Sequence, residues 1–272
     1  MKSGSAIDRI SHPGLGAGGN GLTRSSMALC YHKITTSESR YLYSTTSAQL
    51  AKHFELVSEL AEKTGPVPRL TVTFDDGHIS TYRNGLPLLQ RYFVFATFFV
   101  TASWIGTAEE ALGWEQVREL ARLGHTIGSH GWSHAFLTRC SDSDLEMELT
   151  RSKQTLEDKL GTAVDSISFP GGRWNSRVLR ASSGAGYRQA YCSDPWIAPQ
   201  LREGLELRGR LMVRNNTDCA QLLRLSTPGS ASLLSMRARG MAQQAARTLL
   251  GDDLYLSLWR KLANSGKYDK TP

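Results

Sequence analysis

The stretch "TVTFDDGH", residues 71–78, joins an apolar run to two adjacent carboxylates and a glycine. The run of β-branched and aromatic residues predicts a strand, which ends at Asp75, Asp76 and Gly77. Two neighbouring carboxylates repel each other and lose hydration unless a cation or hydrogen-bond donors compensate them. At a strand end their side chains point in different directions, so each can enter a site in its own way. Taken alone, the stretch fits an exposed Asp-Asp-Gly turn equally well.

Strand and helix patterns alternate on both sides of this stretch. Helical spacing recurs in "AQLAKHFELVSELAEKTG", "YRNGLPLLQRY", "WEQVRELARLG", "SDSDLEMELTRSKQTLEDKLG" and "NSRVLRASSGAG". The seven strand candidates are "MALCYH", "RLTVTF", "FVFATFFV", "HTIGS", "SISF", "QAYCS" and "LRGRLMV". Because strands that alternate with helices form parallel sheets, we expect an α/β fold closed into a barrel.

The chain divides into three predicted regions. Residues 1–26 are rich in Gly and Ser and predict a flexible leader, residues 27–225 form the barrel, and residues 226–272 form a tail of two amphipathic helices. The basic residues of the tail suit peripheral contact with an anionic membrane. The alternative is that the apolar face of the tail packs against the barrel.

The composition is that of a basic, soluble globular protein. Lys and Arg number 32 against 25 Asp and Glu, which gives a formal net charge of +7 and a pI near 9.3. This charge favours an anionic partner, but no Lys/Arg run with interleaved aromatics appears, so we expect no nucleic-acid partner. The leader has no apolar signal segment and no stretch is long enough to span a bilayer. We therefore expect a cytoplasmic protein, and both membrane contact through the tail and packing of the tail on the barrel remain open.

The stretch "SHGWSH", residues 129–134, places His130 and His134 four positions apart after another predicted strand. On the first turn of a helix or in a tight loop, both imidazoles face the same side. In parallel β/α folds the carboxyl ends of the strands form the active-site face, so Asp76 can join this pair. Two histidines and one carboxylate leave coordination positions open, which is typical of a catalytic metal site. Zinc is the ion we expect.

Further segments extend these two motifs. "ATFFVT", "WEQVRELARLGHTIGSHGWSH", "SFPGGRWN" and "AGYRQAY", together with "TFDDGH", resemble the NodB-homology polysaccharide deacetylases, also called carbohydrate esterase family 4. The likeness covers roughly residues 27–215. It implies a distorted (β/α)7 barrel with a helical C-terminal tail. It also implies a hydrolase that removes N-acetyl groups from an amino sugar in a polysaccharide or in a lipid-linked or oligosaccharide precursor. The implied cofactor is a divalent metal, zinc first, with cobalt or nickel as alternatives.

The resemblance assigns roles to individual residues. Asp75 is the implied base that takes a proton from a metal-activated water, and Asp76, His130 and His134 are the implied metal ligands. Most family members carry the general acid on a histidine near the end of the domain, but no histidine follows His134 here. "MALCYHKI" resembles the N-terminal Tyr-His segment of the exopolysaccharide branch, which implies that His32 is the acid.

One motif departs from the family pattern. "SFPGGRW" lacks the arginine that orients the catalytic carboxylate, and Gly171 stands where an aromatic often sits. We expect Arg210 in "GRLMV" to replace that arginine, because an arginine at a strand end can pair with Asp75 and lower its pKa. Arg173 and Arg214 are the alternatives. The Gly171 amide is the expected oxyanion donor, since glycine lets the backbone approach a ligand closely.

The remaining candidates concern the glycan. The predicted substrate-binding residues are Pro170, Gly171, Gly172, Trp132, Trp174, Asp194 and Trp196. Indole rings stack on sugar rings, but each tryptophan fits plain packing equally well. We interpret His78 and His125 as structural residues.

Two alternatives to an N-deacetylase remain open from the sequence. The same metal site could act on another acyl bond, such as a formamide, an imide or an O-acetyl ester. The chain could instead be a non-catalytic sugar-binding barrel that has lost the orienting arginine. The presence of all three ligands and of Asp75 argues against this second alternative.

Overall fold

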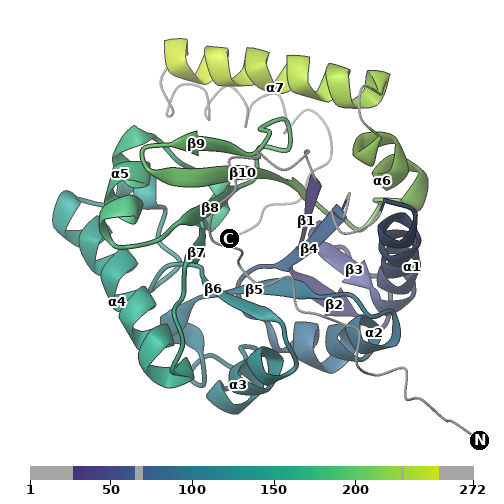
Figure 1. The fold of residues 1–272 in the computed structure, drawn as a ribbon, viewed down its shortest axis with the longest axis horizontal. Coiled ribbons are helices and arrows are strands. Elements are labelled where there is room, and N and C mark those ends of the chain that lie inside the picture. The colour runs from purple at the N-terminus through teal and green to yellow at the C-terminus, as the bar shows by residue number, and fades with distance from the viewer. Residues whose placement is uncertain (1–26, 65–69, 228–229, 251–272) are drawn as a thin grey trace, which may run out of the picture.

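The computed structural model describes residues 27–64, 70–227 and 230–250, and its core is a closed barrel of parallel strands (Figure 1). The barrel strands are β1 (Met27–Tyr31), β4 (Leu70–Phe74), β5 (Ala96–Val100), β6 (Thr126–Ser129), β7 (Ser166–Ser168), β8 (Gln189–Cys192) and β10 (Leu205–Met212). Each pairs in parallel with the next, and β1 closes the ring on β10, with Ala28 opposite Arg210. The structure confirms the predicted seven-stranded α/β barrel.

Helices surround the ring of strands (Figure 1). They are α1 (Ser47–Thr64), α2 (Leu86–Arg91), α3 (Trp114–Arg122), α4 (Asp142–Leu160), α5 (Ser176–Gly184), α6 (Cys219–Ser226) and α7 (Ala231–Leu250). Local signals set the ends of α4. The Ser141 hydroxyl accepts the Asp144 N–H at its start, and Gly161 ends it in the left-handed conformation at φ 69°.

Several short elements were not predicted from the sequence. Strands β2 (Lys33–Thr35) and β3 (Ser44–Thr46) pair in parallel beyond β1, and β9 (Gln200–Arg202) adds an antiparallel edge to β10. Helix α6 also went unpredicted. The three strands have three residues each, too few for an apolar period to show.

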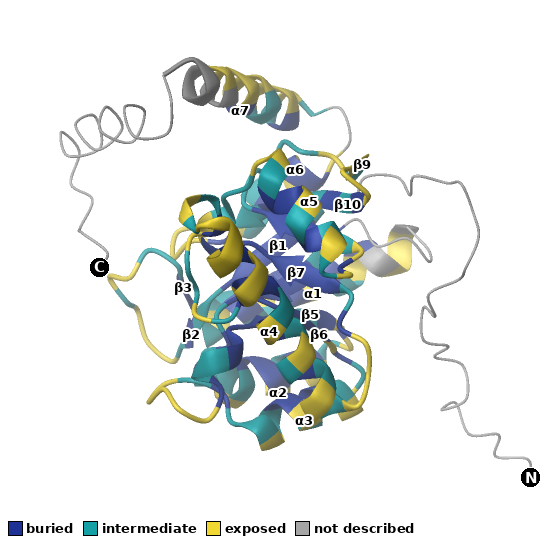
Figure 2. Ribbon diagram, turned by 90° about the vertical axis from the view of Figure 1, so that its left-hand side faces the viewer, coloured by how far each residue is buried: buried dark blue, intermediate teal, exposed yellow. Residues whose placement is uncertain are grey.

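Apolar side chains fill the interior, and the strands are the most deeply buried part of the chain (Figure 2). The rings of Phe74 and Phe98 stack 4.8 Å apart, and Tyr31 lies 5.6 Å from Phe74. Arg210 is fully buried in this interior. A buried guanidinium requires a charged or strongly polar partner, so the position of Arg210 marks a functional or structural centre.

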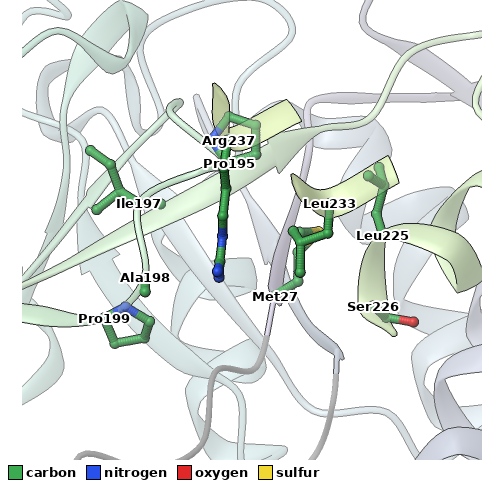
Figure 3. A pocket seen from close by; sticks show the side chains of 10 residues that line it. Met27, Pro195, Ile197, Ala198, Pro199, Leu225, Ser226, Leu233 and Arg237 are labelled. Atoms are coloured by element: carbon green, nitrogen blue, oxygen red, sulfur yellow. The ribbon is translucent and has the colours of Figure 1, made fainter. Parts of the chain in front are cut away.

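The helix α7 lies along the outer side of the barrel beside β9 and β10 (Figure 1). Leu233 is buried, and Gly240 lies so close to the Trp196 ring that a Cβ there would collide with it. Figure 3 shows Arg237 extending towards the segment from Pro195 to Pro199. Part of the apolar face of α7 therefore packs on the barrel. This agrees with the expectation that the tail covers the barrel, which was the alternative to membrane contact.

The outer side of α7 exposes Leu234 and Met241. None of the described helices is long and apolar enough to cross a membrane. The predicted tail begins at Ser226, the last residue of α6. The second predicted tail helix, after residue 251, and the predicted leader, residues 1–26, lie outside the described residues.

Candidate active site

The polar residues singled out in the sequence meet at the carboxyl end of the barrel. His32 follows β1 directly, Asp75 and Asp76 follow β4, and His130 follows β6. Parallel strands bring their carboxyl ends to the same edge, which is where β/α barrels build their sites. The expectation that these segments converge therefore holds.

Asp75 forms a buried ion pair with Arg210. The guanidinium donates from Nη1 to Asp75 Oδ1 at 2.6 Å and from Nη2 to Oδ2 at 2.7 Å. The Ser168 hydroxyl donates to Asp75 Oδ2 at 2.9 Å and accepts from Arg210 Nη2 at 2.6 Å. Arg210 Nη1 also donates to Thr73 Oγ1 at 3.1 Å. Paired bonds of this kind fix the plane and the direction of the carboxylate.

This environment keeps Asp75 ionised. Burial by itself raises the pKa of the carboxyl group, but the charges of Arg210 and His130 and the bonds from Arg210 outweigh it and lower the pKa to about 2. The pairing expected between Arg210 and Asp75 is thus present. Of the two alternatives, Arg214 is exposed, and the Arg173 guanidinium lies 4.7 Å from the centroid of the Phe136 ring.

Asp76, His130 and His134 form a second cluster whose ligand atoms all lie within 4.8 Å of one another. Asp76 Oδ1 lies 3.3 Å from Nε2 of His130 and 3.3 Å from Nε2 of His134. The two histidines belong to a loop rather than to the first turn of a helix, and His134 has a φ of 67°. Bonds from both imidazoles hold the pKa of Asp76 well below its ordinary value against the opposing effect of burial.

This cluster fits a divalent metal ion. His130 Nδ1 lies 2.9 Å from the Ser168 carbonyl oxygen and donates to it, so Nε2, which faces Asp76, becomes the metal-binding nitrogen once it has lost its proton. A lone pair and a carboxylate oxygen that face each other attract a shared cation. The carboxylates of Asp75 and Asp76 outweigh the effect of burial and raise the pKa of His130.

Glu148 of α4 holds the histidine loop in place. It is buried, and its carboxylate accepts the N–H groups of Trp132 at 2.8 Å and Ser133 at 2.9 Å and the Ser133 hydroxyl at 2.5 Å. His134 is further positioned by Trp104, whose ring stacks on the imidazole at 5.1 Å. The loop is therefore fixed by contacts from two other elements.

His32 lies beside Asp75 at the end of β1. One nitrogen of its ring lies within 4.8 Å of an Asp75 carboxylate oxygen and of the Cys30 sulfur. Its Nδ1 is buried without a hydrogen-bond partner among the described residues, and the ring packs 5.3 Å from that of Tyr43. Burial lowers the pKa of His32, opposed by the charges of Asp76 and Asp75.

The loop after β7 begins at the same edge of the barrel as the site. Pro170, Gly171 and Gly172 form a short turn in which both glycines have positive φ, 63° and 66°. The Gly172 N–H donates to the Phe169 carbonyl at 2.7 Å, which leaves Gly171 as the candidate oxyanion donor. Trp174 follows, and its Nε1 donates to Asp194 Oδ2 at 2.9 Å, so two predicted substrate-binding residues are joined.

Two of the predicted tryptophans have packing partners. The Trp132 ring lies 3.8 Å from the Arg151 guanidinium of α4 and packs against the core, which helps to hold the loop. Trp196 lies beneath α7 and faces a cavity shared with Leu211 and Met236. The partners of both rings, Arg151 for Trp132 and α7 for Trp196, could not be predicted from the sequence.

His78 and His125 take structural places, as interpreted. His78 Nδ1 bonds with the Ser80 hydroxyl at 2.8 Å, and His125 Nδ1 accepts the Ala96 N–H at 3.3 Å. Ser168, Glu148 and Trp104 were not predicted as site residues. Ser168 lies within the predicted strand "SISF" and ends β7, which was a usable signal, whereas the sequence around Glu148 gives no indication of its partners.

Comparisons with known proteins agree with this geometry. The model of the polysaccharide deacetylase family matches residues 62–190. A peptidoglycan-N-acetylglucosamine deacetylase of Bacillus cereus is 32% identical over 138 residues, which are 48% of this chain and 61% of that protein. A chitooligosaccharide deacetylase of Sinorhizobium fredii is 28% identical over 139 residues, 49% of this chain and 62% of that protein. The chain thus covers less than two thirds of either relative.

A solved structure shares the fold. The Streptococcus pyogenes deacetylase PplD superposes with a TM-score of 0.68 at 20% identity, covering 75% of this chain and 99% of that one. The family match spans Asp75, Asp76, His130 and His134, and Arg210 lies beyond it. Residues 62–190 of the chain therefore match the polysaccharide deacetylase family, in agreement with the resemblance seen in the sequence.

Proposed function

We propose that this protein is a metal-dependent N-deacetylase that acts on an N-acetylated amino sugar in a polysaccharide or in a lipid-linked or oligosaccharide precursor. The observation that carries the proposal is the convergence of two sets of side chains. An ionised carboxylate, Asp75, lies within 3.9 Å of His130, which belongs to a cluster suited to a divalent ion. Two similar proteins, a peptidoglycan-N-acetylglucosamine deacetylase and a chitooligosaccharide deacetylase, support the substrate class.

Asp76, His130 and His134 would hold the ion, zinc first and cobalt or nickel as alternatives. When bound, it would polarise the acetamide carbonyl and lower the pKa of a water molecule. Asp75 accepts the proton of that water. With a pKa of about 2, Asp75 is always ionised near neutral pH but is a weak base, so it depends on a water already made acidic.

His32 completes the proton transfer. Its ring lies within 4.8 Å of Asp75, so the proton taken from water has a short path to the side of the site where the amine leaves. Because burial lowers its pKa, His32 gives up a proton readily once it has one. The Gly171 amide donates to the developing oxyanion. The link to the exopolysaccharide branch rests on His32 alone and stays a prediction.

The place of action is also a proposal. We propose a cytoplasmic protein in peripheral contact with a membrane through the tail. The exposed side chains of Leu234 and Met241, seven residues apart on α7, support the membrane contact because they share one helix face.

The test is acetate release from N-acetylated oligosaccharides and from nucleotide- or lipid-linked sugars. The protein is stripped of metal and reloaded with zinc, cobalt or nickel, and its metal content is measured beside the rate. We expect release that depends on added metal, and we expect Asp75→Asn to bind one metal per chain without turnover. Turnover by Asp75→Asn would remove Asp75 as the base. Metal binding by the wild type without acetate release would favour another acyl bond or a sugar-binding role.

A further inference from the structure

Phe136 is a partly exposed aromatic residue at the rim of the candidate site. It comes two residues after His134, and 39% of its surface is exposed. The next residue, Leu137, is fully buried, so the chain turns inward directly after displaying this ring. The exposed part of the ring is apolar surface that a ligand at this rim could bury.

The backbone that carries Phe136 is held on its C-terminal side. The Phe136 carbonyl accepts the Arg139 N–H at 2.8 Å. Arg177 of α5 donates from Nη2 to the carbonyls of Leu137 at 3.4 Å and Cys140 at 2.9 Å. On the N-terminal side, Glu148 fixes the loop as described above. The ring is thus presented from a fixed backbone, and a side chain with two rotatable bonds loses little entropy when it contacts a ligand.

Phe136 fills the space that a side chain at position 171 would occupy. A Cβ added to Gly171 would lie 2.5 Å from Phe136 Cε1 and 3.1 Å from Cδ1, too close for any residue with a side chain. The φ of 63° at Gly171 adds a second reason for glycine. The aromatic surface beside Gly171 therefore comes from the loop after β6 instead of the loop after β7.

We propose that Phe136 is a specificity-determining residue that stacks against the C–H-rich face of a pyranose ring of the glycan. The inference rests on the proposed function and deepens it by assigning a wall to the sugar site. The Arg173 and Arg139 guanidinium groups lie over the ring at 4.7 and 5.8 Å from its centroid, and the 39% of Phe136 that stays exposed is the surface offered to the sugar. Contact with the ring, next to the candidate oxyanion donor, would place the acetamido group over Gly171.

The experiment compares Phe136→Ala, Phe136→Tyr and Phe136→Trp with the wild type, all loaded with the same metal. Stacking contributes to the ground state and the transition state alike, so we expect KM for an N-acetylglucosamine oligosaccharide to rise roughly 3- to 10-fold in Phe136→Ala with kcat little changed. Tyr and Trp should restore KM, because both retain an aromatic face. An unchanged KM in Phe136→Ala, or no rescue by Tyr or Trp, would overturn the proposal.

Phe95→Ala is the matched control. Phe95 is 50% exposed and precedes the first residue of β5, at the opposite end of the barrel, so its loss should leave KM unchanged. Calorimetric binding of the same oligosaccharide separates this proposal from the proposed function, since it needs no turnover. Binding that weakens in Phe136→Ala alone would support stacking even if no acetate were released. Absence of binding to the wild type, or equal weakening in both variants, would refute it.

Discussion

Asp75 and Asp76 are consecutive residues in two opposite environments. The inner pocket, formed by Asp75, Arg210, Ser168 and Thr73, is buried, and its carboxylate is saturated with donors. The outer cluster is formed by Asp76, His130 and His134. Here the carboxylate and two imidazoles direct lone pairs towards one point, and Asp76 and His134 are partly exposed. The first arrangement fixes the direction of the Asp75 carboxylate, and the second arrangement is suited to binding a divalent metal ion.

The backbone produces this difference. The Asp75 N–H still donates to the Tyr31 carbonyl at 2.9 Å, so Asp75 continues the ladder between β4 and β1 and points into the barrel. At Asp76 the chain leaves the strand with a φ of 71°, and Gly77 continues at 80°. Two left-handed residues in succession direct the second carboxylate to the rim. In the order Asp-Asp-Gly, two chemically identical carboxylates therefore have different surroundings, because Asp75 points into the barrel and Asp76 points to the rim.

Arg210→Met should have the largest effect, because it leaves the inner carboxylate buried and unpaired. We expect the free energy of unfolding to fall by about 3 to 5 kcal/mol, measured by urea denaturation. Arg208→Met is the control on the same strand. Arg208 pairs with Glu206 and is less deeply buried, so its loss should cost about 1 kcal/mol or less.

A double replacement tests the cause of that loss. Asp75→Leu combined with Arg210→Met removes both charges, and well-packed apolar residues often stabilise a core as well as a buried pair does. We therefore expect the double variant to be more stable than Arg210→Met alone. If the double variant were equally unstable, lost packing of the Arg210 side chain would be responsible instead of the unpaired carboxylate.

The convergence of the strand ends at the inner pocket and the pairing of Asp75 with Arg210 could be predicted from the sequence. Strand ends could be located, the parallel pattern gave their common edge, and a strand-borne arginine was the available partner for Asp75. The supports of the outer cluster were not readable. Glu148 sits on an ordinary amphipathic helix, and its bonds to the loop depend on how α4 packs, which no local pattern encodes. The packing partners of Trp132 and Trp196 were not predictable for the same reason, since an indole stacks on a sugar or on an arginine with similar ease.

His134→Ala should separate the outer cluster from the inner pocket. We expect metal affinity to fall by at least about 100-fold, because even residues that only orient a ligand cost 10- to 100-fold when lost. The free energy of unfolding of the metal-free protein should change by less than about 1 kcal/mol, since the His134 side chain is 31% exposed. His78→Ala is the matched control and should keep full metal affinity. A loss of stability as large as that of Arg210→Met would contradict the division into two regions.

Glu148→Gln should have the smallest effect and should act on the outer cluster alone. Gln keeps the size of Glu, and its oxygen can replace Oε2 as acceptor of the Trp132 and Ser133 N–H groups, but its NH2 group cannot accept the Ser133 hydroxyl and the negative charge is lost. The loop between His130 and His134 then loses part of its support, and we expect metal affinity, measured by competition with a chelator, to fall about 10-fold. Glu146→Gln, on an exposed turn of the same helix, removes an equal charge without touching the loop and should change nothing. Equal losses in the two variants would show that the long-range charge of α4, and not the hydrogen bonds of Glu148, supports the cluster.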